Sequence, residues 1–169
     1  MFPQFEERLS DSPFVERIWS TQSERADSFT SISTILWSMV ISKVRGRLSI
    51  SLHGPQTGAT CTEFPPEAEW FGIMFKLGTF VPDILPGSLI DGHIVLPDTS
   101  GRSFSLCHSA WQFPNYENAD TFVERLVREE LLVCDPIIGP VLRGEPQELS
   151  LRSVQRRVVQ ANGLTQGSI

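Results

Sequence analysis

The stretch 149–165 reads LSLRSVQRRVVQANGLT, and its pattern predicts a short helix with one apolar and one basic face. The apolar residues recur at the spacing of one helical face: Leu151, Val154, Val158 and Ala161. Ser150 precedes the first of them and can cap the helix, because its hydroxyl accepts a hydrogen bond from an amide one turn in. Asn162 and Gly163 mark the end, since both tolerate the left-handed conformation that terminates helices.

The front of this helix carries Arg152, Gln155 and Arg156. Arg and Gln side chains contact phosphates and the edges of guanine and adenine. The segment before it, 135–144, begins with Asp-Pro, which is a helix start. Pro140 lies inside that segment and would cost about 3 kcal/mol in a regular helix, so the segment should be short or kinked. A helix, a polar turn and a basic helix are the organisation of a helix-turn-helix.

A second amphipathic helix is expected over 118–133, before the helix-turn-helix segment. Its apolar stripe is formed by Phe122, Val123, Leu126, Val127 and Leu131. Charged residues occupy the other face, and Glu124 and Arg128 form a favourable pair four residues apart. An apolar stripe of this kind is one candidate for a contact between two copies of the chain.

The first two thirds of the chain is rich in strand signals. Leu48, Ile50 and Leu52 alternate with serines, which predicts a half-buried strand. Further strands are expected at 32–41, 57–64, 70–75, 92–96 and 103–108. Gly72 interrupts an apolar run and suggests either a bulge or a close approach of another group to the backbone. Short strands separated by Gly and Pro turns predict an α+β protein whose β part is an antiparallel sandwich or small barrel.

Composition and charge narrow the classes of protein. The chain has 169 residues and a net charge of −6. Residues 141–169 hold four arginines against two glutamates, a net +2, so residues 1–140 carry −8. No run of 18 apolar residues indicates a membrane span, and the start MFPQFEERLS lacks the pattern of a secretory signal. Three widely spaced cysteines suggest free thiols, so we expect a cytoplasmic protein.

The stretch 149–165 resembles the first DNA-reading unit of the AraC family of bacterial transcription regulators. The family pattern LS-x-R-x-x-QRRF-x-x-x-x-GLT is matched at Leu149, Ser150, Arg152, Gln155, Arg156, Arg157, Gly163, Leu164 and Thr165. WFGIMFKLGTF and NYENADTFVERLVREELLVCDP also resemble the sensor half of one subgroup. The resemblance implies a cupin-like sensor and dimerisation domain over 1–133 and an incomplete helix-turn-helix segment over 134–169.

Carried over to this sequence, the resemblance makes Arg152, Gln155, Arg156 and Arg157 the residues that contact promoter DNA. It also implies a homodimer that responds to an unknown small-molecule effector, without a cofactor or membrane attachment. Val158 stands where the family usually has Phe, and Pro140 weakens the supporting helix. The sequence stops at Ile169, where the family continues into a second helix-turn-helix. We therefore expect weak or no DNA binding from this chain alone.

Candidate effector-binding residues are aromatic residues and histidines of the β part. The five candidates are Trp37, His53, Trp70, Phe75 and His93. Phe71, Trp111 and Phe113 are further aromatic residues able to line a cavity. A pocket of mixed aromatic, Ser and His character suits a small organic molecule.

The alternative function is a stand-alone cupin-like binding protein or a metal-dependent enzyme. Its three histidines are His53, His93 and His108, and no two share the close spacing that is usual for metal ligands. Cys107 adjoins His108, but neighbouring residues on a strand point to opposite faces and cannot pair. The sequence therefore predicts no metal site and no catalytic residues, and analysis of the purified protein for bound Fe, Mn or Zn would distinguish the two classes.

Overall fold

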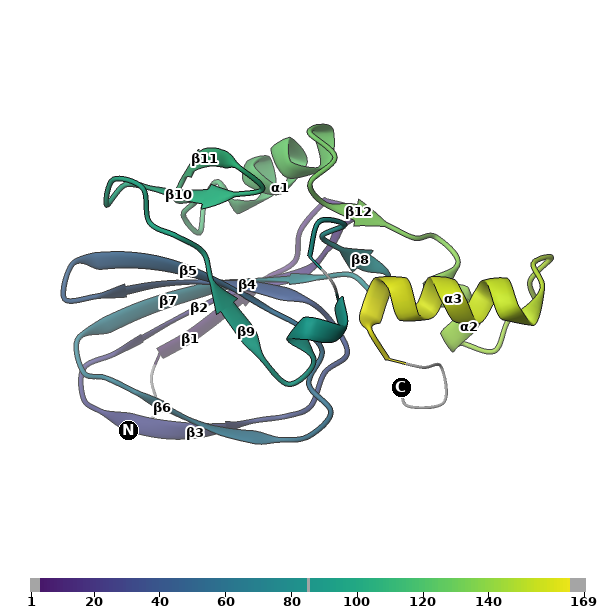
Figure 1. The fold of residues 1–169 in the computed structure, drawn as a ribbon. Helices are drawn as coiled ribbons and strands as arrows, with labels where there is room; N and C mark the ends of the chain where they lie inside the picture. The colour runs from purple at the N-terminus through teal and green to yellow at the C-terminus, as the bar shows by residue number, and fades with distance from the viewer. Residues whose placement is uncertain (1–3, 85, 165–169) are drawn as a thin grey trace.

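The computed structural model describes residues 4–84 and 86–164. A six-stranded antiparallel sheet forms its centre, with a two-stranded ribbon below it and a layer containing a helix above it (Figure 1). Two further helices lie at one end of the sheet (Figure 1). This arrangement confirms the predicted α+β class with an antiparallel sheet. The predicted small barrel is wrong for the described residues, because their strands form four separate sheets and none of these closes on itself.

The strands are β1 (Gln4–Arg8), β2 (Val15–Ser23), β3 (Asp27–Ser31), β4 (Ser38–Val44), β5 (Arg47–His53), β6 (Thr60–Phe64), β7 (Ala68–Phe75), β8 (Thr79–Phe80), β9 (His93–Val95), β10 (Ser103–Leu106), β11 (Ser109–Gln112) and β12 (Val133–Cys134). The helices are the 3₁₀ turn η1 (Pro86–Leu89) and the α-helices α1 (Ala119–Arg128), α2 (Ile138–Leu142) and α3 (Leu151–Asn162). None of these helices has the length and apolar character that crossing a membrane requires.

The central sheet has the strand order β1-β2-β7-β4-β5-β9. Arg45 and Gly46 both have positive φ, 51° and 79°, and form the tight turn that joins β4 to β5. Such a turn suits a two-residue hairpin because its twist matches that of the strands. Gly72 lies on β7 opposite Trp19, and a Cβ at Gly72 would lie 2.2 Å from the indole ring. The close approach predicted at Gly72 is therefore confirmed.

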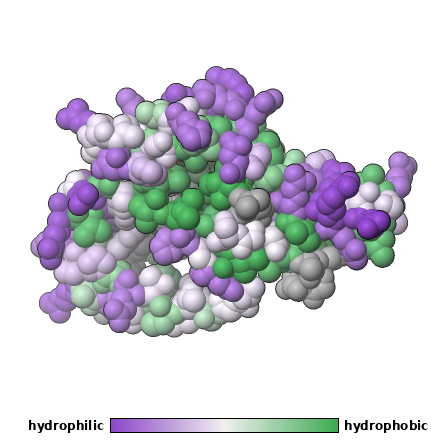
Figure 2. Space-filling view, viewed as in Figure 1, coloured by the Kyte–Doolittle hydropathy of each residue, from purple (hydrophilic) through white to green (hydrophobic). Residues whose placement is uncertain are grey.

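The upper face of the sheet forms the hydrophobic core. Its buried members on the sheet are Ile18, Met39, Ile41, Ile50, Leu52 and Ile73. They pack in one cluster with Phe104, Trp111, Phe122, Val123 and Leu126 of the layer above. Figure 2 shows hydrophobic side chains gathered between the sheet and this layer. Each fully buried side chain of this size stabilises the fold by about 1.5–3 kcal/mol relative to an exposed one.

The ribbon below the sheet, β3 with β6, continues the pairing of β2 with β7. Ser23 pairs with Ala68 at the end of one ladder, and Asp27 pairs with Phe64 at the start of the next. The chain bends between the two ladders, where the Ser23 hydroxyl donates to the Pro65 carbonyl at 2.7 Å. The ribbon is thus an extension of two central strands that is folded under their own sheet (Figure 1).

Two expected elements end earlier than the sequence suggested. The strand expected over 103–108 is wrong at its end, because Cys107 and His108 have positive φ and turn the chain from β10 into β11. The helix expected over 118–133 ends at Arg128, and Val133 pairs with Phe80 of β8 instead. Similarly, residues 32–37 precede β4 without forming a strand, and Ile32 is 79% exposed.

The end helices pack on the sheet through apolar side chains. Ile138 and Val141 of α2 and Val154, Val158 and Ala161 of α3 belong to the same cluster as the sheet core. The indole Nε1 of Trp37 donates to the Ala161 carbonyl at 3.0 Å, which joins α3 to the segment before β4. The predicted ends of α3 are confirmed: Ser150 accepts from the Ser153 amide at 3.2 Å, and Gly163 has a φ of 74°.

Candidate functional site

The outward face of α3 carries three of the four residues expected to contact DNA. Arg152, Gln155 and Arg156 are exposed, whereas Val154 and Val158 face the core. Figure 2 shows hydrophilic residues gathered over α3. The helix therefore presents guanidinium and amide groups to solvent from a rigid base, which is the arrangement that a nucleic-acid-reading helix needs.

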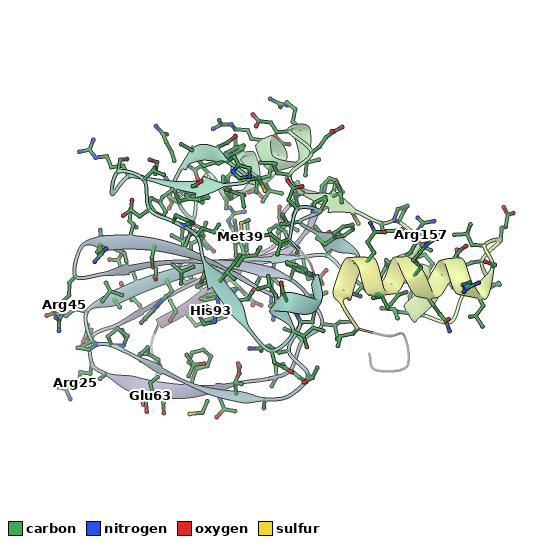
Figure 3. The ribbon with its side chains drawn as sticks, viewed as in Figure 1. Arg25, Met39, Arg45, Glu63, His93 and Arg157 are labelled. Carbon is green, nitrogen blue, oxygen red and sulfur yellow. The ribbon has the colours of Figure 1, made fainter. Side chains whose placement is uncertain are left out.

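Arg157, the fourth of these residues, faces inward and forms an ion pair. Its Nε and Nη2 donate to both carboxylate oxygens of Asp135, at 2.7 and 2.5 Å. The same carboxylate accepts from the Ile137 amide at 3.1 Å, in the turn that precedes α2. Asp135 raises the pKa of Arg157 through these hydrogen bonds. Arg157, labelled on α3 in Figure 3, thus holds this helix to Asp135 in the turn between β12 and α2 through the ion pair.

The lower face of the sheet, which faces the ribbon, is polar. Strand pairing places its side chains in three rows: Thr21, Trp70, Ser42 and Ser49; then Trp19, Gly72, Val40, Ser51 and Val95; then Arg17, Met74, Ser38, His53 and His93. The Ser42 and Ser49 hydroxyls are 2.6 Å apart, and Ser51 is 2.9 Å from the Nε2 of His53. We call these three rows the polar face. In Figure 3, His93 lies on this side of the sheet and Met39 on the core side.

His53 and His93 form a stacked pair at one end of the polar face. Their ring centroids are 4.8 Å apart with an interplanar angle of 15°. Burial, and secondarily the charge of a protonated His93, lower the pKa of His53 to about 4. The His53 ring is therefore neutral at pH 7 and offers one donor and one acceptor. Such a pair can orient a polar ligand by hydrogen bonds.

Trp70 lies at the other end of the polar face, where the ribbon touches the sheet. Its ring meets Phe64 of β6 edge-on at 5.7 Å, and Phe64 in turn contacts Phe29 of β3 at 6.1 Å. Phe29 nevertheless remains 50% exposed, and the other ribbon residues except Phe64 and Ser31 are also exposed. The ribbon therefore covers the polar face without packing tightly against it.

The structure brings together three of the five predicted ligand residues. His53, His93 and Trp70 share the polar face, whereas Trp37 and Phe75 are almost fully buried, at 1% and 0% exposure. Trp37 and Phe75 belong to the hydrophobic core, so neither is available to line a site on the polar face. Their prediction as ligand-binding residues is therefore corrected to a packing role.

Metal-binding and nucleophilic groups are sparse in the described part of the chain. Residues 4–84 and 86–164 hold no group of three His, Cys, Asp or Glu side chains placed to bind a metal ion. Cys107 and His108 lie in a turn and not on a strand. The expectation that alternation along a strand points their side chains to opposite faces is therefore wrong. Burial, followed by a hydrogen bond to Asp83 and its charge, raises the pKa of Cys107 to about 11. The thiol is therefore protonated at neutral pH, which is unfavourable for a nucleophile.

Comparison of the chain with protein-family models, with curated proteins and with solved structures finds no match.

Sequence reasoning missed the serines of the polar face. Ser49 and Ser51 form the polar half of an alternating strand pattern, and this pattern alone predicts only an exposed face. The paired position of Ser42 and the covering ribbon depend on contacts between segments far apart in the chain. The clustering of serines at 38, 42, 49 and 51 on both sides of one turn was the available signal.

Proposed function

We propose that this protein is the effector-sensing and dimerisation portion of a cytoplasmic AraC-type transcription regulator, with a cupin-like sensor and part of a helix-turn-helix. The observation that carries the proposal is the orientation of α3. Three of the four residues that match the family's DNA-reading pattern, Arg152, Gln155 and Arg156, are exposed, while Val154 and Val158 are buried. In an ordinary surface helix, the exposed positions would have no reason to coincide with the DNA-reading positions of a family pattern.

The polar face is the proposed effector site of this regulator. Hydroxyl, imidazole and indole groups converge there beneath a loosely packed ribbon. A small organic effector with several hydrogen-bonding groups fits this surface, because pockets combine apolar contact area with a few fixed polar groups. His53 and Ser51 are the residues proposed to orient it.

The proposed homodimer must use a surface other than the apolar stripe of α1. Ala119, Phe122, Val123 and Leu126 are at most 6% exposed, because they pack against the sheet of the same chain. The expectation that this stripe forms a contact between two copies is therefore corrected. The outward face of α1 carries charged residues, among them Glu124 and Arg128.

The DNA-reading role is tested by titrating the full chain onto a fluorescein-labelled duplex and following anisotropy. We expect weak binding, with a Kd in the range of about 10⁻⁶–10⁻⁴ M that is typical of few phosphate contacts. The double variant Arg152→Ala/Arg156→Ala should weaken it further and reduce the slope of log affinity against log salt by roughly 2, since each phosphate contact contributes about 0.9.

The matched control removes two exposed arginines elsewhere, in Arg47→Ala/Arg128→Ala. These lie on β5 and α1, so the control has the same net charge but an intact α3. It should keep most of the affinity and the salt dependence of the unchanged protein. Equal losses in the two double variants would show that net charge alone governs binding, and the proposal would fail.

A further inference from the structure

A groove of about 670 Å³ lies on the upper side of the sheet, on the opposite face from His53 and His93. Its floor is formed by two neighbouring rows of side chains: Ser20, Phe71 and Ile41, then Gln22, Glu69, Lys43 and Leu48. Its wall is the segment 113–117, which leads into α1. The volume falls within the range of small-molecule sites, about 300–1,000 Å³.

The wall of the groove is held in place by hydrogen bonds. The Arg8 guanidinium donates to the Tyr116 carbonyl at 2.7 Å and to the Asp120 carboxylate at 2.8 Å. Asn115 and Asn118 exchange reciprocal bonds, in which each amide donates to the other's side-chain oxygen at 2.8 Å. A wall fixed in this way does not have to be ordered when a ligand binds, which lowers the cost of binding.

Aromatic rings supply the apolar surface of the groove. Phe71 rises from the floor, and Phe113 and Tyr116 come from the wall; all three are half-buried. Arg8 already lies 5.1 Å from the centroid of the Tyr116 ring, so this ring faces one cation within the chain itself. Half-buried aromatic rings at a groove favour a ligand that carries a flat ring, which can stack on them.

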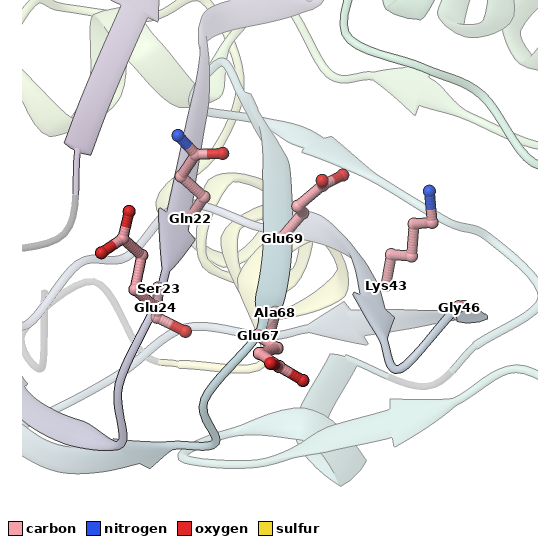
Figure 4. A pocket seen from close by; sticks show the side chains of 8 residues that line it. All are labelled: Gln22, Ser23, Glu24, Lys43, Gly46, Glu67, Ala68 and Glu69. Atoms are coloured by element: carbon pink, nitrogen blue, oxygen red, sulfur yellow. The ribbon is translucent and has the colours of Figure 1, made fainter.

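The lining of the groove carries a net negative charge. Glu6, Glu69 and Glu117 line it with one cationic lining residue, Lys43, while Arg8 lies outside the lining against the Tyr116 ring. None of the four charged lining side chains forms an ion pair with any residue of the described chain. A shallower hollow of about 330 Å³ adjoins the groove and shares Gln22, Lys43 and Glu69 with it. Figure 4 shows Glu69 and Lys43 projecting to the same side of the sheet there.

We propose that this groove binds a small organic cation, a protonated amine attached to an aromatic ring. The ring stacks among Phe71, Phe113 and Tyr116, and the ammonium group lies by the carboxylates of Glu69 and Glu117. The groove lies on the opposite face of the sheet from His53 and His93, and of its lining only Thr21 and Trp70 also belong to the polar face. The inference uses neither of these two residues and does not rest on the proposed function. The two proposals are tested separately: DNA binding tests the proposed regulator, and ligand binding tests the groove. Failure of one experiment leaves the other proposal standing.

The test compares three probes that share one ring and one chain length: 2-phenylethylammonium, 2-phenylethanol and 3-phenylpropionate. Binding is followed by the backbone amide signals of Phe113, Tyr116 and Glu117 in NMR titrations of the full chain. The cation should bind with a millimolar Kd, and the alcohol should bind at least about threefold more weakly, as expected for exposed charge pairs. The anion should bind most weakly.

Two variants locate the site. Glu69→Gln/Glu117→Gln should weaken binding of the cation about three- to tenfold while leaving binding of the alcohol within about twofold. The control Glu63→Gln/Glu124→Gln removes two exposed carboxylates on the ribbon and on α1, and should leave both affinities unchanged. Equal binding of the anion, equal effects of the two double variants, or no shift of these amides at about 10 mM cation would each overturn the proposal.

Discussion

At the scale of single residues, His53 shows how position changes chemistry. Its ring is largely buried, stacks on His93, and is hydrogen-bonded to the Ser51 hydroxyl at 2.9 Å. Burial disfavours the charged imidazolium, and a protonated His93 disfavours it further, so the pKa of His53 falls to about 4. A ring that resists protonation keeps the hydrogen-bonding pattern of the polar face unchanged down to mildly acidic pH.

This lowered pKa predicts a loss of stability in acid. Above about pH 6.5 the ring is neutral in both the folded and the unfolded chain, so it contributes no pH dependence. Between about pH 6.5 and 4 the unfolded chain binds a proton that the folded chain refuses, and stability falls by at most roughly 3 kcal/mol. Urea unfolding of the protein and of His53→Gln at several pH values measures the difference.

The variant His53→Gln should lose less stability than the unchanged protein over this range, since Gln does not titrate. The exposed His108 provides the comparison, and His108→Gln should retain the full dependence. Identical pH profiles for the protein and His53→Gln would show that His53 titrates in the folded state as it does in the unfolded state.

At the scale of elements, local sequence signals predict the limits of α3, whereas the positions of other elements depend on contacts between distant segments. Ser150 and Gly163 mark the ends of α3 within the sequence itself, so its limits could be predicted. The helix α1 ends early at a turn in which Glu130 has a φ of 60° and the Leu131 amide donates to the Leu126 carbonyl, and Val133 then pairs with Phe80, more than fifty positions away. Periodicity identifies two faces of β5 but does not reveal that a ribbon covers the polar one. The candidate site was therefore only partly predictable.

The cap of α3 gives a prediction at this scale. Ser150→Ala removes the oxygen that accepts from the Ser153 amide, and should lower the free energy of unfolding by about 1 kcal/mol. Chemical denaturation followed by circular dichroism measures the change. Ser33→Ala, at an exposed position outside the strands and helices, is the matched control and should have little effect. Equal stabilities of the two variants would contradict a stabilising role for the cap.

At the scale of the whole molecule, α2 and α3 are continuous with the sheet. The division at residue 133 that the sequence suggested falls within the strand β12, whose pairing with β8 joins the end helices to the rest. Val158 and Ala161 have no exposed surface and share one cluster with the sheet core, and Trp37 donates to Ala161. The segments on both sides of residue 133 therefore stabilise each other through a shared core.

This continuity predicts a single unfolding transition. Loss of helix, followed by circular dichroism, should coincide in urea with loss of tryptophan burial, followed by fluorescence. Val158→Ala should shift both curves together, by an amount on the order of 2 kcal/mol, because it creates a cavity in the shared core. An earlier loss of the helical signal in either protein would show that 134–164 unfolds as a unit of its own.

The bend between the two ladders is one of two places where the ribbon is attached to the rest of the chain. Each ladder has its own hydrogen bonds, and residues 24–26 and 65–67 between them belong to neither ladder. At its far end, a bridge between Thr34 and Gln56 leads directly to Trp37 and so to α3. The ribbon is therefore attached at both ends, and its far attachment is the segment whose Trp37 also binds the basic helix.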